Sequence, residues 1–411
     1  MLEELPDNLD ETYERILREV RKPNQRHAHR LLQCLVVAAR PLQVEELAEV
    51  LAFDFSGEGM PKLNPSWRWE DQEEAVLSTC SSLVTIVKDS DSDSRVVQFS
   101  HFSVKEFLTA DPLAEPIRDV SRYHIRLEAA HTILAQACLG VLLRLDDRIH
   151  RDNIKDFPLV RYAAQYWPTH ARAENVSSRI KNEMECLFDA DKPCFATWLW
   201  VYNGDGWIRT LFTERPEKPT AVPLYYATRL GFQELAEHLI AEHPEHVNAE
   251  GGEEVTPMHA AAAAGHANIL SLLIEHGGDL NGWAMNGNTP LRRASRNGKL
   301  EAGKLLLDHG ADVDAPDRYD NTALMGAIYQ GHVEFARMLL DRGAQIDART
   351  HSGRTALHYA AIMNQVEGAR LLLERSASVN VSDISGFTPL GCARGEMVQL
   401  ICEYGGESGK M

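Results

Sequence analysis

The stretch TALHYA, from Thr355 to Ala360, recurs along the C-terminal half of the chain at a fixed interval. The same six-residue frame reads TPMHAA, TPLRRA, TALMGA, TALHYA and TPLGCA, and it starts at Thr256, Thr289, Thr322, Thr355 and Thr388. A degenerate copy, VPLYYA, begins at Val222, one position further from Thr256 than the interval requires. A constant interval of about 33 residues predicts an array of small units that stack on one another.

Each unit is expected to form two short helices. The frame Thr can cap the first helix, and Pro in its first turn sacrifices no hydrogen bond. A Gly follows this helix in four units, at Gly231, Gly265, Gly298 and Gly331. An apolar second helix comes next, for example Val333 to Leu340, and it ends at a Gly such as Gly343, which supplies the left-handed conformation that terminates a helix.

The last two units depart from this pattern. Asn364 and Ser376 stand where the two Gly residues are usual, and the final unit is two residues short between Ala393 and its second helix. A compressed final unit is typical of a cap, so the array is expected to end there.

The T-P-L-H-x-A frame, repeated at this interval, resembles the ankyrin repeat family. The resemblance implies an ankyrin-repeat array over residues 219–406, with six units of which the first and last are degenerate. It also implies that the array binds a protein and has no catalytic role. His259 and His358, in the frame itself, are expected to bridge backbone groups of neighbouring repeats.

Residues 1–110 predict a winged-helix domain. Helices are expected over residues 11–20, 27–39, 44–52 and 73–80, with Asp10 able to cap the first, and a tight turn at residues 40–42. Two β-rich runs, Leu83–Val87 and Arg95–Ser100, are separated by a polar loop and predict a hairpin. Residues 111–218 predict a helical connector, with helices over 124–145, 176–187 and 195–202. The fold class expected for the whole chain is therefore mainly α.

The N-terminal region carries a second resemblance. The stretches LPDNLDETYERIL (5–17), ARPLQVEELAEVLAF (39–53), CSSLVTIV (80–87) and FSHFSVKEFL (99–108) together resemble the winged-helix segment that follows the NACHT nucleotide-binding domain in fungal NACHT–ankyrin proteins. A related winged helix is named after GPI inositol-deacylases. FPLVRYAAQYWPTHA (157–171) resembles the helical linker of the same proteins.

The nucleotide-binding loop of that family has no counterpart in this sequence. The loop reads G-x-x-x-x-G-K-[ST], whereas Gly298-Lys299 continues as Leu300. The chain begins about where such a domain would end. Two interpretations stay open: a non-enzymatic scaffold or sensor, or the regulatory half of a nucleotide-dependent switch whose NTPase is absent from this chain.

A role in binding DNA is not expected. The second helix of a helix-turn-helix, here residues 44–52, would enter the major groove, and it presents Glu45, Glu46 and Glu49 to the phosphates. The net charge of −18 points the same way. This domain is therefore interpreted as a packing and interaction module.

No catalytic, cofactor or metal site is predicted. His243-Pro244-Glu245 imitates the H-x-E of zinc deaminases, but no P-C-x-x-C follows. The acidic stretch 89–94 lacks the Gly and Glu of a calcium loop. The seven Cys form no C-x-x-C pair, and the apolar run 31–39 is too short to span a membrane. These features favour a cytoplasmic location, with the nucleus also open; the oligomeric state is left open.

The surface of the array is the remaining candidate for function. Partners of such arrays dock on the hairpin tips before each frame Thr and on the exposed ends of the first helices. Aromatic and Arg side chains, which contribute most at protein interfaces, gather there. The expected partner contacts are Trp283, Met285, Arg296, Arg318, Tyr319, Tyr329, Arg349, His351, Arg354, Ile362 and Met363. The arginines predict a protein partner with an acidic or mixed face; the alternative is ordinary surface decoration.

Overall fold

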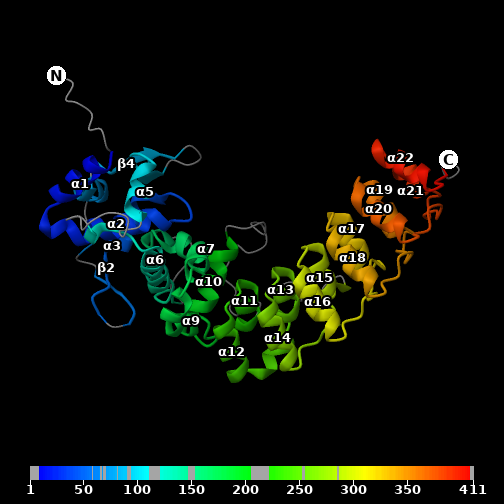
Figure 1. Cartoon of the computed structure of the whole chain (residues 1–411). Helices are drawn as coiled ribbons and strands as arrows, with labels where there is room; N and C mark the ends of the chain where they lie inside the picture. Colours follow the sequence, from blue (N-terminus) through cyan, green and yellow to red (C-terminus); the bar gives the residue numbers. More distant parts are fainter. Residues whose placement is uncertain are drawn as a thin grey trace, which may run out of the picture. The chain divides into compact units, whose positions relative to one another are not determined.

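The computed structural model describes residues 9–57, 59–64, 67, 71–80, 82–89, 94–110, 121–146, 153–204, 222–251, 255–284 and 287–407. The chain divides into two compact units, Met1–Pro219 and Thr220–Met411. Both consist mainly of helices, which confirms the expected fold class (Figure 1). In the described residues, no helix is both long and apolar enough to cross a membrane.

The N-terminal unit begins with the four helices predicted from the sequence. They are α1 (Leu9–Glu19), α2 (Gln25–Val37), α3 (Val44–Leu51) and α4 (Gln72–Cys80), with the 3-10 turn η1 (Lys22–Asn24) between α1 and α2. A further helix, α5 (Ser103–Thr109), was not predicted. Asp10 lies inside the first turn of α1, so the expectation that it caps this helix is wrong. Its carboxylate still complements the positive end of the helix dipole.

A small antiparallel sheet completes this region. Strands β4 (Val84–Lys88) and β5 (Arg95–Phe99) form the predicted hairpin, in a register that sets Ile86 opposite Val97. A third strand, β1 (Leu42–Gln43), pairs with the other edge of β5. The sequence predicted only a turn there. The separate strands β2 (Phe53–Asp54) and β3 (Lys62–Leu63) pair with each other.

The remainder of the first unit is helical. It comprises η4 (Ser121–Tyr123), α6 (Leu127–Leu142), η5 (Ile154–Asp156), α7 (Val160–Ala171), α8 (Val176–Arg179), α9 (Lys181–Leu187) and α10 (Pro193–Gly204). The single helix expected over residues 176–187 is interrupted at the fully buried Ile180. Trp167 on α7 and Trp198 on α10 are also fully buried and meet edge to face, so these aromatic side chains form part of the core.

Two of the three Glu residues of α3 are buried. Glu45 is exposed, but Glu46 and Glu49 are only 2% and 3% exposed. Glu46 forms an ion pair with Arg40 at 2.6 Å, and Glu49 Oε2 accepts the backbone N–H of Leu159 at 2.8 Å. The prediction that three carboxylates face outward is therefore wrong for two of them. Helix α3 is covered on most of its surface, and a covered helix is poorly placed to enter a DNA groove.

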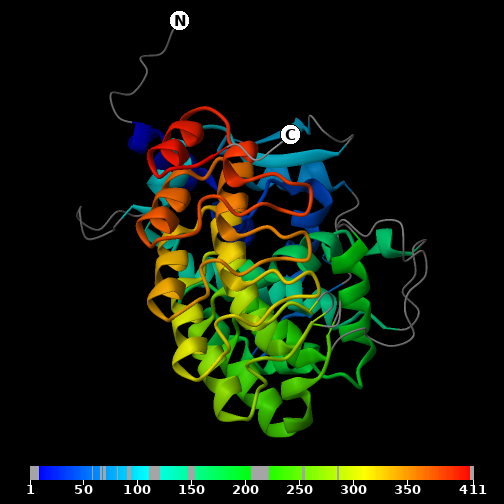
Figure 2. The same ribbon diagram turned by 90° about the vertical axis from the view of Figure 1, so that its right-hand side faces the viewer.

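The second unit is an array of helix pairs. In its described residues the pairs are α11 (Pro223–Leu230) with α12 (Gln233–Glu242), α13 (Pro257–Ala264) with α14 (Ala267–Glu275), α15 (Pro290–Arg296) with α16 (Leu300–Asp308), α17 (Ala323–Gln330) with α18 (Val333–Asp341), α19 (Ala356–Ile362) with α20 (Val366–Glu374), and α21 (Pro389–Cys392) with α22 (Glu396–Glu403). The turn η6 (Pro244–Asn248) follows α12. The pairs stack in sequence order, from green to red in Figure 1, and the connecting segments run along one side of the helices (Figure 2).

Left-handed residues terminate the helices as the repeat predicts. Gly331 ends α17 at φ 77° and Gly343 follows α18 at φ 88°. Asn364 and Ser376 adopt the same conformation, at φ 54° and 66°, although neither is Gly. The first helix of the final unit, α21, has only four residues, so this unit is compressed.

A ladder of polar side chains links each unit to the next. These side chains lie one repeat interval apart, and each accepts a backbone N–H from the following unit at 2.7 to 2.9 Å: Asn248 from Asp279, Asn281 from Asp312, Asp314 from Gln345, Asp347 from Ser378 and Asn380 from Glu407. The repeat interval is therefore fixed by hydrogen bonds as well as by apolar packing.

Candidate protein-binding surface

One side chain organises each hairpin tip in the second half of the array. It lies five positions before the frame Thr. Asp317 Oδ1 accepts the backbone N–H groups of Tyr319 and Asn321, each at 2.8 Å. Asp383 does the same for Ser385 and Phe387, at 2.9 and 3.0 Å. Carboxylates that accept backbone N–H groups hold a turn in one conformation, so these tips present their outer side chains in fixed positions.

The frame histidines bridge neighbouring units, as predicted. His259 Nε2 lies 2.8 Å from the carbonyl oxygen of Asn288, and His358 Nε2 lies 3.1 Å from that of Phe387. Because a carbonyl oxygen only accepts, Nε2 carries the proton and Nδ1 is left to accept from the frame Thr. Burial lowers the pKa of His259 to about 4 and also lowers the pKa of His358, so both imidazoles are neutral at pH 7.

Arg292 occupies the frame position of these histidines in the third unit. Its Nη2 forms an ion pair with Asp317 Oδ2 at 2.8 Å, and its Nη1 donates to Asn288 Oδ1. Burial lowers the pKa of this guanidinium against the attraction of Asp317. The bridge between units is therefore ionic here, and Asp317 serves both the bridge and its hairpin tip.

The predicted aromatic and apolar contacts are exposed. Trp283 and Tyr319, on successive tips, are 69% and 56% exposed. About two-fifths of the surface of three further residues is exposed: Tyr329 on α17, and Ile362 and Met363 at the end of α19. Met285 lies outside the described residues.

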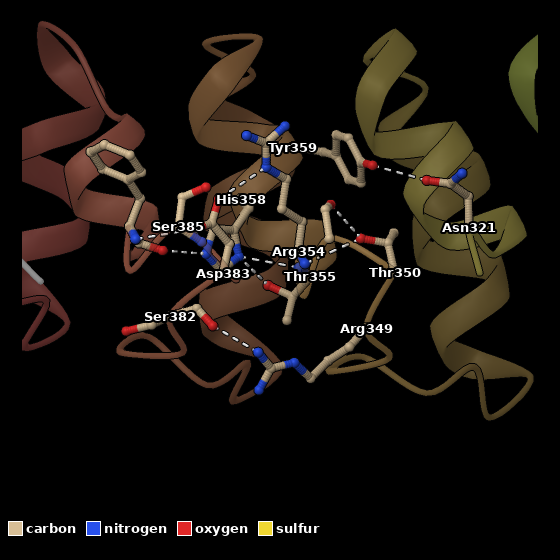
Figure 3. Close-up of polar contacts among 12 residues, drawn as sticks. Asn321, Arg349, Thr350, Arg354, Thr355, His358, Tyr359, Ser382, Asp383 and Ser385 are labelled. Carbon is tan, nitrogen blue, oxygen red and sulfur yellow. Dashed lines mark hydrogen bonds and ion pairs between the residues drawn. The ribbon is translucent and has the colours of Figure 1, made fainter. Parts of the chain in front are cut away.

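The predicted cationic contacts fall into two groups. Arg349, His351 and Arg354 are engaged by neighbouring units. Arg349 Nη2 donates to the Ser382 carbonyl at 2.7 Å, and Arg354 Nε donates to Asp383 Oδ2 at 3.2 Å (Figure 3). His351 Nδ1 lies 2.5 Å from Asp320 Oδ2.

Arg296 and Arg318 form the second group. Both side chains are exposed, and within the described part of the chain neither guanidinium forms an ion pair or a hydrogen bond. These two cations can therefore meet a partner without giving up a contact within the array.

A shallow pocket of about 350 Å³ lies between the third, fourth and fifth units. Tyr329 and Tyr359 meet edge to face at 6.0 Å between ring centroids, and the Tyr359 hydroxyl donates to Asn321 Oδ1 at 2.9 Å. Arg296 and Tyr319 also line it. The pocket thus joins aromatic faces to one free cation and several fixed polar groups.

Sequence reasoning missed part of this pocket. It did not single out Arg292, Asp317 or Tyr359, which line the pocket. A signal was present for the first two, because a charged residue at a frame position that is otherwise buried requires a counter-charge close by. Asp317 stands on the tip that follows Arg292 in the sequence.

The H-x-E fragment lies in the turn η6 and its preceding residue. His243, Glu245 and His246 place their possible ligand atoms within 4.8 Å of one another, and this side-chain group could hold an ion. His243 Nδ1 is 3.2 Å from Glu245 Oε1, which is an exposed local contact.

Known proteins match both halves of the chain. Residues 224–317, 314–383 and 347–410 match the family described as ankyrin repeats (3 copies). Residues 13–117 match the family described as GPI inositol-deacylase, winged helix domain. The two matches confirm the resemblance to ankyrin repeats and to the winged helix named after GPI inositol-deacylases.

A fungal relative aligns with much of the chain. Azaphilone pigments biosynthesis cluster protein L of Monascus ruber is 33% identical over 290 residues, which cover 67% of this chain and 60% of that protein. The chain thus spans about three-fifths of the length of the relative that it matches.

Proposed function

We propose that this chain, which carries ankyrin repeats and a winged-helix domain of the GPI inositol-deacylase type, is a non-enzymatic scaffold or sensor whose array binds a protein partner. Ankyrin repeats are non-catalytic interaction modules. The observation that carries the proposal is the set of exposed aromatic and apolar side chains on successive tips and first helices, next to the pocket of the third to fifth units.

The pocket suggests how a partner would be held. A partner side chain would enter between Tyr319, Tyr329 and Tyr359, where aromatic faces offer large contact area at little conformational cost. Arg296 at the rim would meet a carboxylate of the partner. Arg318, on the same tip as Tyr319, would meet a second one.

The charge of the partner follows from which cations are free. Since Arg349, His351 and Arg354 already contact the array itself, the acidic complement need only match Arg296 and Arg318. We therefore propose a partner whose surface is mixed, with apolar side chains between two acidic positions.

The test is partner capture by the full chain, followed by reconstitution with the purified partner. Replacing Trp283, Arg318 and Tyr319 together by Ala should weaken binding at least about a hundredfold, because interface anchors contribute roughly 2 kcal/mol or more each. The midpoint of thermal unfolding should not change, since these side chains form no hydrogen bond or ion pair among the described residues.

A matched control removes similar side chains from second helices and the final cap. Arg337, Arg370 and Tyr404 are also substantially exposed. Replacing these three by Ala should leave binding unchanged. Wild-type affinity in the first triple variant would refute the proposed surface.

The winged-helix match over residues 13–117 supports a second candidate function. This domain type resembles the one that follows the NACHT domain, so the chain could be the regulatory half of a nucleotide-dependent switch. An in-frame G-x-x-x-x-G-K-[ST] in the genomic sequence upstream of Met1 would favour that function. A partner complex that forms with this chain alone, with no response to nucleotide, would favour the scaffold.

A further inference from the structure

A cavity of about 410 Å³ lies in the N-terminal unit, Met1–Pro219, between α2 and η4. Arg26, Arg30 and Arg122 line it together with His29 and Tyr123. The other lining residues are Gln25, Gln33 and Ile133. Three arginines on one cavity stand out in a chain whose net charge is −18. The volume lies in the range of about 300 to 1,000 Å³ that is usual for small-molecule sites.

Arg30 is a buried cation with little compensation. Arg30 is only 6% exposed, and its Nη1 donates to the carbonyl oxygen of Phe53 at 2.9 Å. The guanidinium also lies 4.2 Å from the centroid of the Phe55 ring. No carboxylate in the described residues is within ion-pair distance of Arg30. Asp54 attracts this guanidinium without forming an ion pair with it, so part of the buried charge stays uncompensated and a bound anion would lower that cost.

The balance of charge around the cavity is positive. Asp54 forms a long ion pair with Arg26, at 3.8 Å. Arg122 Nη1 donates to Gln25 Oε1 at 3.3 Å and has no carboxylate partner in the described part of the unit. The three arginines exceed this one aspartate by two positive charges (3 − 1), of which the exposed Arg26 and Arg122 are partly solvated, and the excess attracts an anion. A phosphate monoester carries about −1.5 to −2 at pH 7.

Two further polar atoms at this cavity are buried without a partner. They are the Tyr123 hydroxyl and His29 Nε2, and Tyr123 is only 1% exposed. Burial, Arg30 and His124 lower the pKa of His29, and burial raises the pKa of the Tyr123 hydroxyl. At pH 7 the hydroxyl is therefore a hydrogen-bond donor. Neither atom is accessible to solvent, so a ligand in the cavity cannot reach them, and the arginines are the groups that it meets.

We propose that this cavity binds a small phosphorylated molecule, with the phosphate held by Arg30 and Arg122. Arginine favours this ligand because its planar guanidinium can donate two parallel hydrogen bonds to phosphate oxygens. The cavity exceeds the size of the phosphate group, and Ile133 offers an apolar wall to the organic part. This site is independent of the array and of its proposed partner.

The test is equilibrium dialysis of the full chain against radiolabelled pyrophosphate at physiological ionic strength, where charges beyond about 8 Å are screened. We expect saturable binding of one pyrophosphate per chain. Phenyl phosphate should displace it at lower concentration than inorganic phosphate, because its ring adds apolar contact. Acetate, which carries a single charge, should displace it only at much higher concentration.

Two variants address the phosphate contacts without disturbing the fold. Arg122→Gln removes an exposed cation and should weaken binding about tenfold or more, the size expected for a lost charge-assisted hydrogen bond. Tyr123→Phe should leave binding unchanged, because the hydroxyl is buried out of reach of the cavity. It should leave the midpoint of thermal unfolding unchanged or raise it, since the hydroxyl has no partner in the protein.

Arg161→Gln is the matched control, because Arg161 is an exposed arginine on α7 away from the cavity lining. It should bind pyrophosphate as the wild type does. The proposal is overturned if the wild type shows no saturable binding, if Arg122→Gln keeps wild-type affinity, or if acetate competes as well as phosphate. If inorganic phosphate displaces pyrophosphate at a lower concentration than phenyl phosphate does, the inference that the ligand has an apolar organic part is wrong.

Discussion

Arg292 and Asp317 form an ion pair of 2.8 Å between two units of the array, with side chains only 9% and 4% exposed. In the second and fifth units, a neutral His connects to a carbonyl oxygen at the same frame position. The array therefore has two chemically different bridges, and the ionic one depends on a second charged residue.

Replacing Asp317 by Asn should destabilise the third and fourth units strongly. Asn can still accept the backbone N–H groups of the tip, but the Arg292 cation would stay buried without a counter-charge, at a cost of about 3 to 5 kcal/mol. Hydrogen exchange of the α15 and α17 amides would report the loss locally. Asp383→Asn is the control, because Asp383 makes the same backbone contacts while its partner Arg354 is 37% exposed. Equal effects in the two variants would show that burial of the cation is unimportant.

The stability of the array should fall as the pH drops from about 6.5 towards 4. The pKa of His259 is about 4 in the folded protein, whereas an unfolded His titrates near 6.5. Between these values the unfolded chain binds a proton that the folded imidazole does not bind, so unfolding becomes easier as the pH decreases. The expected loss from His259 is roughly 2 kcal/mol between pH 7 and pH 5.

Urea unfolding at pH 7 and pH 5 would measure this loss. His358 should add to it, since its pKa is lowered in the same direction. In His259→Asn the difference between the two pH values should shrink, even though the variant is less stable at pH 7. An undiminished difference would assign the acid sensitivity to other groups.

Ser376→Gly should stabilise the fifth unit. Ser376 has φ 66°, a left-handed conformation that costs a residue with a Cβ about 1 to 2 kcal/mol. Gly343 holds the equivalent position one unit earlier, at φ 88°, and a Cβ there would meet no atom within 4 Å. Gly343→Ser should therefore destabilise by a similar amount through backbone conformation alone. The two changes in unfolding midpoint should have opposite signs; a shared sign would contradict this explanation.

Glu49→Ala should destabilise the N-terminal unit, Met1–Pro219, whereas Glu45→Ala should have little effect. Removing Glu49 leaves the buried N–H of Leu159, at the start of α7, without its acceptor, which costs about 1.5 to 3 kcal/mol. Glu45 is exposed on the same helix, and such substitutions stay within about 0.5 kcal/mol. Guanidinium unfolding of the two variants would compare them, and the reverse order would mean that α3 is oriented differently.

The sequence predicted elements whose causes are local. The frame Thr, the Gly at 331 and 343 and the apolar spacing between them act within one unit, and the helix pairs follow from them. Exposure of Trp283 and Tyr319 was also predictable, because tip positions have few neighbours in the sequence to cover them. Strand β1 was missed because two residues beside Pro41 give no periodic signal.

Features that depend on distant residues were not predictable in the same way. Glu49 on a charged helix surface suggests exposure, yet its partner is Leu159, far along the chain at the start of α7. The sequence suggests that Arg349 is free to bind a partner, but its guanidinium donates to the carbonyl of Ser382 in the next unit. The anion cavity combines Arg30 with Arg122 and Tyr123, which no short motif connects.

The polar ladder from Asn248 to Asn380 determines how such a chain can change in length. Each rung joins one unit to the next and to nothing further away. Duplicating or deleting a complete unit between Asn281 and Asp347 would reproduce every rung, whereas adding a few residues inside a unit would displace an amide from its acceptor. Gene duplication can therefore extend the binding surface in whole steps, and each added step brings its own tip.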